Sequence, residues 1–89
     1  MIRMFVRHDV TDYAKWLAVF DGFAQEASGM GVKAQAVYQA ADKATDVTVT
    51  CDFDDLPSAQ AFAPAPRLKE AMGEAGVAGA PQIWFTSPS

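Results

Sequence analysis

The chain has 89 residues, of which 51% are hydrophobic, and a formal net charge of −4. Its length fits one small domain spanning residues 1–89, and its composition is typical of a globular protein rather than a disordered one. No basic stripe, no run of about 18 apolar residues and no signal-peptide pattern exists, so we expect a cytoplasmic protein without a nucleic-acid or membrane partner.

The amino-terminal half predicts a strand over 2–9, a helix over 12–28 and a second strand over 32–40. Apolar residues in the helix recur at spacings of three and four, which places them on one face. Thr11 is the expected N-cap, and Gly29 suits the left-handed conformation that often follows a helix end.

The carboxyl-terminal half predicts a strand over 46–53, a helical stretch over 56–75 and a last strand over 82–86. Pro64 and Pro66 interrupt the helical stretch, and we expect it to break there because proline cannot continue a helix from its interior. The resulting order, βαββαβ, predicts a ferredoxin-like α+β fold, with a four-stranded antiparallel sheet and the helices on one face.

Alternation along the strands separates an apolar set of residues from a more polar one. The polar set carries Phe5, Val37 and Trp84, a mixed surface that suits a partly buried seam, so we expect a homodimer. Arg7 and Asp52 belong to the same set on neighbouring strands, and we expect a salt bridge between them. The apolar set, expected to meet the helices, is Ile2, Met4, Val6, His8, Val32, Ala34, Ala36, Tyr38, Val47, Val49, Cys51, Phe53, Ile83 and Phe85.

His8 is the only histidine and ends the first strand on the apolar side. An imidazole in an apolar cleft loses basicity and can serve near neutral pH as an acid, a base or a ligand anchor. The alternative is a structural histidine, hydrogen-bonded to a helix cap or a backbone carbonyl. If the chain is catalytic, we expect His8 to transfer a proton and Tyr13 or Tyr38 to orient a phenol or carbonyl of the substrate.

Aromatic and apolar side chains are expected around His8, as in a site for a small organic molecule. Arg67 would either bind a carboxylate there or be solvated, and Cys51 is expected to be a buried, unreactive thiol. The same side chains would also fill an ordinary core, so a purely structural dimer stays open; a cavity of about 300 Å³ or more would admit an organic ligand. The candidate ligand-binding residues are Trp16, Phe20, Cys51, Phe53, Phe62, Arg67 and Met72.

Several common sites are missing from the sequence. It contains no nucleophile elbow, no glycine-rich phosphate loop and no cluster of histidine, cysteine and aspartate at metal-ligand spacing. We therefore expect neither a cofactor nor a metal ion.

Three groups of residues carry a family resemblance. They are residues 6–13 with Trp16 and Phe20-Asp21, residues 52–55 with Ala59 and Phe62, and residues 66–68 leading through Ala71-Met72 to 75–77. With them the chain resembles the dimeric α+β barrel superfamily, which includes antibiotic-biosynthesis monooxygenase-like and cyclase-like proteins. The resemblance implies that two sheets pair into a barrel, and that each subunit holds a small-molecule pocket between sheet and helices, at the His8 cleft.

The resemblance also implies a range of activities. Some members oxidise polycyclic aromatic substrates without metal or flavin, and others cyclise polyketides, isomerise lactones or degrade haem. The haem-degrading branch relies on an asparagine, a tryptophan and a histidine on the second helical stretch, and this chain has no asparagine and no histidine beyond His8. A cofactor-free monooxygenase or a cyclase- or isomerase-like enzyme acting on a small hydrophobic or aromatic molecule remains. The alternative is a non-catalytic ligand-binding or stress-associated dimer.

Overall fold

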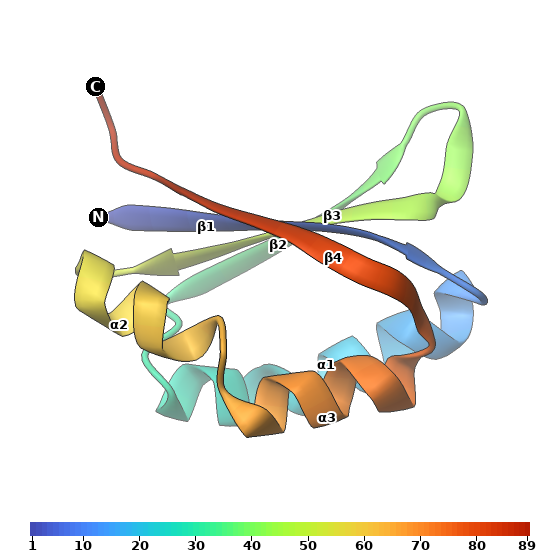
Figure 1. The fold of residues 1–89 in the computed structure, drawn as a ribbon, viewed down its shortest axis with the longest axis horizontal. Coiled ribbons are helices and arrows are strands. Elements are labelled where there is room, and N and C mark those ends of the chain that lie inside the picture. The colour runs from blue at the N-terminus through green and yellow to red at the C-terminus, as the bar shows by residue number, and fades with distance from the viewer.

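The computed structural model describes residues 1–89 as a four-stranded antiparallel sheet with three helices. The strand order is β2-β3-β1-β4, and all three helices lie on one side of the sheet (Figure 1). This confirms the ferredoxin-like α+β fold. None of the helices is long and apolar enough to cross a membrane. The elements are β1 (Ile2–Val10), α1 (Tyr13–Gly29), β2 (Ala34–Ala40), β3 (Lys43–Phe53), α2 (Leu56–Phe62), α3 (Pro66–Ala75) and β4 (Val77–Thr86).

The ends of α1 differ from the prediction by one or two residues. Asp12, not Thr11, is the N-cap, because its extended backbone lets the carboxylate accept a hydrogen bond from the Lys15 amide at 3.2 Å. At the other end Gly29 stays helical, and Gly31 takes the positive φ, 104°. The chain therefore leaves the helix later than the sequence indicated.

The second helical stretch breaks where the prolines predicted. The first piece, α2, ends at Phe62, and the second, α3, begins at Pro66, which occupies the first turn where its missing amide hydrogen costs nothing. Gly76 then ends α3 in the left-handed conformation, with φ of 78°. A Cβ at Gly76 would lie 2.8 Å from the Thr11 hydroxyl, so the close approach of the two loops requires glycine.

The last strand is longer than predicted, because it starts at Val77 and pairs there with Val10. Its register against β1 shifts between Arg7 and Asp9, which leaves His8 at an irregularity of the β1–β4 ladder. Such a bulge locally bends the strand and changes where its side chains point.

The two sides of the sheet are called here the helix face, covered by the helices, and the open face. The alternation predicted for β2 is wrong, because residues directly opposite one another point to the same side of a sheet. Gln35 pairs with Cys51 and Tyr38 pairs with Thr48, so Gln35 lies on the helix face and Tyr38 on the open face. Val32 is buried ahead of the strand, held by a hydrogen bond from its amide to the end of α1, and its burial does not fix the alternation that follows.

The open face joins charged pairs to an aromatic stack. The rings of Phe5 and Trp84 stack with centroids 5.3 Å apart. The predicted bridge between Arg7 and Asp52 is wrong in its partners, because the β1–β3 register places Asp52 opposite Arg3. Two bidentate pairs form instead, Arg3 with Asp52 and Arg7 with Asp46, each with a closest N···O distance of 2.7 Å.

Candidate functional site

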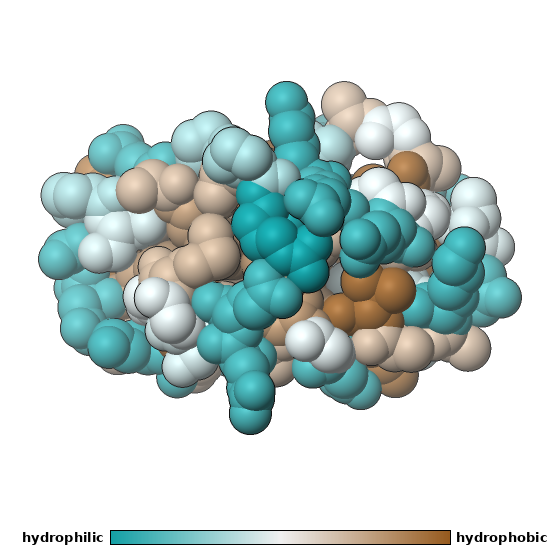
Figure 2. All heavy atoms as spheres, turned by 90° about the horizontal axis from the view of Figure 1, so that it is seen from below, coloured by the Kyte–Doolittle hydropathy of each residue, from teal (hydrophilic) through white to brown (hydrophobic).

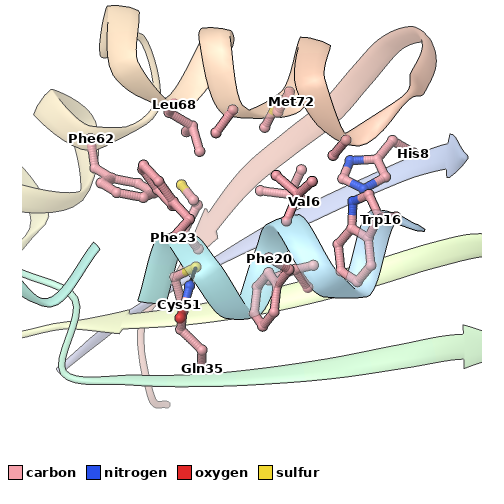
Figure 3. Close-up of a pocket in the computed structure, with 15 residues that line it drawn as sticks. Val6, His8, Trp16, Phe20, Phe23, Gln35, Cys51, Phe62, Leu68 and Met72 are labelled. Atoms are coloured by element: carbon pink, nitrogen blue, oxygen red, sulfur yellow. Dashed lines mark hydrogen bonds between the residues drawn. The ribbon is translucent and has the colours of Figure 1, made fainter. Parts of the chain in front are cut away.

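A cavity of about 60 Å³ lies between the helix face and the helices α1 and α3, partly open to the surface (Figure 3). Of its 15 lining residues, 13 are hydrophobic, and the two exceptions are His8 and Gln35. Six of the residues predicted for the site line it: His8, Trp16, Phe20, Cys51, Phe62 and Met72. The lining residues that the sequence reasoning did not select are Met4, Val6, Val19, Phe23, Gln35, Val49, Leu68, Ala71 and Ala75.

His8 is buried, with only 7% of the residue exposed, and neither ring nitrogen has a hydrogen-bond partner. The structural alternative, an imidazole bonded to a helix cap or a backbone carbonyl, is therefore wrong for this conformation. The ring packs edge-on against Trp16, with centroids 5.7 Å apart. A buried polar group without a partner costs about 1–3 kcal/mol, which a bound hydrogen-bonding molecule would recover.

Burial lowers the pKa of His8 below its usual value, because the surroundings disfavour the charged imidazolium. The carboxylates of Asp9 and Asp46 oppose this effect but do not outweigh it. His8 is therefore neutral near pH 7. One ring nitrogen then donates and the other accepts a hydrogen bond, so the side chain can take up a proton from a bound hydroxyl group.

At the other end of the cavity, the Gln35 side chain donates a hydrogen bond from Nε2 to the sulfur of Cys51 at 3.5 Å (Figure 3). Burial raises the pKa of the Cys51 thiol, so the sulfur is protonated at neutral pH and a poor nucleophile. The wrong alternation expected for β2 is the reason that sequence reasoning missed Gln35.

The two candidate tyrosines lie outside the cavity. Tyr13 is half-buried and stacks on Trp16, with ring centroids 5.9 Å apart, but it does not line the cavity. Tyr38 is 57% exposed on the open face, so the sheet separates it from His8. The structure therefore brings neither tyrosine to the cavity wall beside His8. The aromatic side chain that packs against His8 is Trp16, which in turn stacks on Phe20 with ring centroids 5.1 Å apart.

Two further candidates serve the packing around the cavity. Phe53 is fully buried and packs against Phe62, with ring centroids 5.4 Å apart, but does not line the cavity. Arg67 is neither free to bind a carboxylate nor simply solvated. Its guanidinium forms a bidentate pair with Glu26, closest distance 2.6 Å, and lies 5.5 Å from the centre of the Phe23 ring. This pair joins α3 to α1, and the neighbouring Arg67 holds the pKa of Glu26 below its usual range.

Comparison with known proteins places the fold. No protein-family model matches the chain, and no curated protein matches its sequence. Solved structures do match over nearly its whole length. A putative antibiotic biosynthesis monooxygenase from Bordetella bronchiseptica superposes with a TM-score of 0.85 at 14% identity, covering 99% of this chain and 96% of that one. The fold is that of the antibiotic biosynthesis monooxygenase-like proteins.

Two further structures support the same fold. SnoaB, a cofactor-independent oxygenase from Streptomyces nogalater, has a TM-score of 0.80 at 12% identity, with 99% of this chain and 92% of that chain covered. A conserved protein from Methanosarcina mazei Go1 has a TM-score of 0.78 at 15% identity, with the same two coverages. At these identities the likeness shows the fold and not the activity.

The cavity is small in this conformation. At about 60 Å³ it has room for a few water molecules, whereas a site for an organic ligand needs about 300 Å³ or more. Val19, Phe20 and Met72 line it and are only half-buried, so the cavity wall reaches the surface at these side chains. Figure 2 shows the helix side of the molecule, where hydrophobic atoms are exposed on both sides of a hydrophilic band.

A second, polar hollow lies at the irregularity between β1 and β4, and His8 lines it too. Its charges are already matched: Arg7 pairs with Asp46 at 2.7 Å and Lys43 with Asp9 at 3.3 Å. Because no charge there lacks a partner, we assign no ligand to this hollow. The chain also has no group of three histidine, cysteine, aspartate or glutamate residues that could hold a metal ion.

Proposed function

We propose that this protein binds a small hydrophobic or aromatic molecule between the helix face and the helices, and acts on it as a cofactor-free monooxygenase or a cyclase-like enzyme. The observation that carries the proposal is His8, buried with two unpartnered ring nitrogens in a cavity whose walls are otherwise almost entirely apolar. A buried polar group without a partner calls for an explanation, and a ligand that hydrogen-bonds to it is the simplest one.

The chemistry available to His8 is proton transfer. A phenol or enol in the cavity donates its hydroxyl proton to the accepting ring nitrogen, and the electron-rich anion that remains is the reactive form of such molecules. The lowered pKa of His8 keeps the imidazole neutral and ready to accept that proton at pH 7. The largely apolar walls lower the effective dielectric constant around His8, which strengthens the attraction between the imidazolium and the anion formed.

The fold is compatible with the oxygenase reading of this proposal. SnoaB shares it, and that protein is a cofactor-independent oxygenase. No part of the proposed step needs a metal or a flavin, since His8 moves only a proton.

A second copy of the chain would cover the open face in this proposal. Trp84 is 42% exposed there and stacks on the half-buried Phe5, and Tyr38 adds a third aromatic side chain. Exposed aromatic side chains grouped on one sheet face are typical of an interaction surface.

A non-catalytic binding protein is the second candidate, and one observation favours it. Besides His8, the only titratable group lining the cavity is Cys51, and burial raises the pKa of that thiol. Neither Tyr13 nor Tyr38 lies in the cavity wall to orient a substrate. A single titratable residue is enough to anchor a ligand, whereas catalysis requires that His8 also complete a proton transfer.

The first test is native mass spectrometry of the protein purified gently from its own host. We expect the mass of a dimer carrying a small organic molecule. A bare dimer that also fails to bind 2-naphthol would contradict the pocket. Binding of 2-naphthol is followed by NMR on the His8 ring signals. The matched control is Ala71→Val, which adds two methyl groups to the cavity wall and should block binding while leaving His8 in place.

The second test separates the enzyme from the binding protein. With the molecule identified from the host, His8→Ala should lower kcat by about 10²- to 10⁴-fold, the usual contribution of a general base, while the dimer stays intact. Unchanged turnover in His8→Ala would remove the proton-transfer role. Absence of any turnover in the unaltered protein, with binding retained, would favour the second candidate.

A further inference from the structure

We propose that Gln35 is the second polar anchor of the cavity, so that its ligand is an uncharged, elongated molecule with a hydrogen-bonding group at each end. This inference rests on the proposed function and adds to it the chemical class of the ligand. It starts from the composition of the wall, in which His8 and Gln35 are the two residues that are not hydrophobic.

The hydrogen bonding of Gln35 is incomplete. Its side chain forms one hydrogen bond, from Nε2 to the Cys51 sulfur at 3.5 Å, and a thiol is a weak acceptor. The carbonyl oxygen and the second N–H of the amide remain available. Gln35 is half-buried and its remaining polar atoms are not sealed from water, so a ligand group at this position would take the place of water. A ligand group at this end of the cavity would complete the bonding.

The two anchors are too far apart for one polar group to reach both. His8 lies opposite Val47 and Gln35 lies opposite Cys51, so they are four residues apart along β3, about 13 Å at the usual rise per residue. They also lie on β1 and β2, on either side of β3, which adds about 10 Å across the sheet. Figure 3 shows the two side chains at opposite ends, with apolar side chains between them. The ligand must therefore be long, apolar in the middle and polar at both ends.

The charge of the wall restricts the end groups. No lysine or arginine lines the cavity, and the nearby Arg67 is held outside it by Glu26. A carboxylate or phosphate would lose its hydration there without a cation to replace it, which strongly disfavours binding. Hydroxyl and carbonyl groups remain, since the Gln35 amide can accept from the first and donate to either.

The test compares two compounds that differ only in the second polar group, 2-naphthol and 2,6-dihydroxynaphthalene. Their dissociation constants are measured by NMR for the unaltered protein, for Gln35→Leu and Gln35→Met, and for the control Gln39→Leu. Gln39 lies on the same strand and face, bonds to the Ala44 carbonyl and does not line the cavity. Equal binding of 2-naphthol by all four proteins shows that the variants fold with an intact cavity.

We expect the second hydroxyl to tighten binding by about fivefold to tenfold, the value of one neutral hydrogen bond, in the unaltered protein and in Gln39→Leu. Both Gln35 variants should lose this gain. A gain that persists in them, or is absent from the unaltered protein while 2-naphthol binds, would overturn the role of Gln35 alone. Failure of 2-naphthol itself to bind would overturn the pocket, and this inference with it.

Discussion

The two faces of the sheet treat polar groups in opposite ways. On the open face the charges are matched, with Arg3 bonded to Asp52 and Arg7 to Asp46, although water could have solvated them. On the helix face, where an unmatched polar group costs most, His8 has no partner at either nitrogen. The fold therefore pairs its polar groups where pairing is easy and leaves one polar group unpaired where pairing is hard. We take this as the mark of a binding function rather than of packing.

The largest predicted loss of stability comes from a substitution in the core between the helix face and the helices. Phe53→Ala should lower the free energy of unfolding by about 3–5 kcal/mol, because Phe53 is fully buried against Phe62 and its removal leaves a cavity. Urea denaturation measures the loss. Phe5→Ala, the matched change on the half-buried open face, should cost less than half as much. Equal losses would mean that the two faces do not differ in packing as described.

The next effect tests whether a second copy covers the open face. Trp84→Ala should weaken the dimer by about 30-fold or more, since buried tryptophans at interface centres are typically worth 2 kcal/mol or more. Sedimentation over a range of concentrations measures the dissociation constant. The control is Leu56→Ala, a similarly exposed apolar residue on α2, on the other side of the sheet. A monomeric unaltered protein at micromolar concentration would rule out the open face as a seam.

A smaller effect follows from the lowered pKa of His8. The unfolded chain binds the histidine proton at about pH 6.5, and the folded chain binds it only at lower pH, so acid favours the unfolded state between these values. Protonation of His8 therefore leaves the free energy of unfolding unchanged above about pH 6.5. The free energy of unfolding falls as the pH drops from there toward the pKa of His8 in the folded chain. Each pH unit of difference between the pKa of His8 in the folded and in the unfolded chain lowers the free energy of unfolding at acid pH by about 1.4 kcal/mol.

The substitution His8→Leu should abolish this dependence of folding stability on pH. Denaturation midpoints measured from pH 7.5 down to pH 5 should decline for the unaltered protein and stay level for the variant. The carboxylates of Asp46 and Asp52, whose pKa values the paired arginines hold below their usual range, lose stability only at lower pH and do not obscure the window. The same decline in both proteins would mean that His8 is not the group responsible.

Patterns among residues close together in the sequence made much of the fold predictable. The apolar periodicity of α1 and the break at Pro64 and Pro66 depend on neighbours in sequence, and both are correct to within a residue or two. The early start of β4 was not predictable in this way. It depends on the pairing of Val77 with Val10, which lies across an irregularity that no local pattern encodes.

In the candidate site, too, the residues set by local sequence patterns were predictable and those set by the pairing of distant strands were not. His8, Trp16 and Phe20 could be found from the alternation of β1 and the face of α1. Gln35 and Tyr38 were assigned to the wrong sides of the sheet, because their side is set by the register of β2 against β3. That register follows the turn at Met30 and Gly31 that precedes β2 rather than the alternation itself. An error of one residue in the alternation assigned to β2 was enough to leave Gln35, the second polar residue of the cavity wall, out of the prediction.

The smallest predicted change in stability comes from breaking an ion pair on the open face. Arg3→Met removes the pair with Asp52 and should change the stability of the isolated subunit only slightly, because half of the Arg3 side chain is in water and exposed ion pairs contribute little. If a second copy covers the open face, Asp52 then becomes a buried carboxylate without its cation, and the dimer should weaken more than the subunit does. Denaturation at concentrations below and above the dissociation constant separates the two. Equal losses at both concentrations would place Arg3 and Asp52 outside the seam, and would limit the covered part of the open face to the surroundings of Trp84.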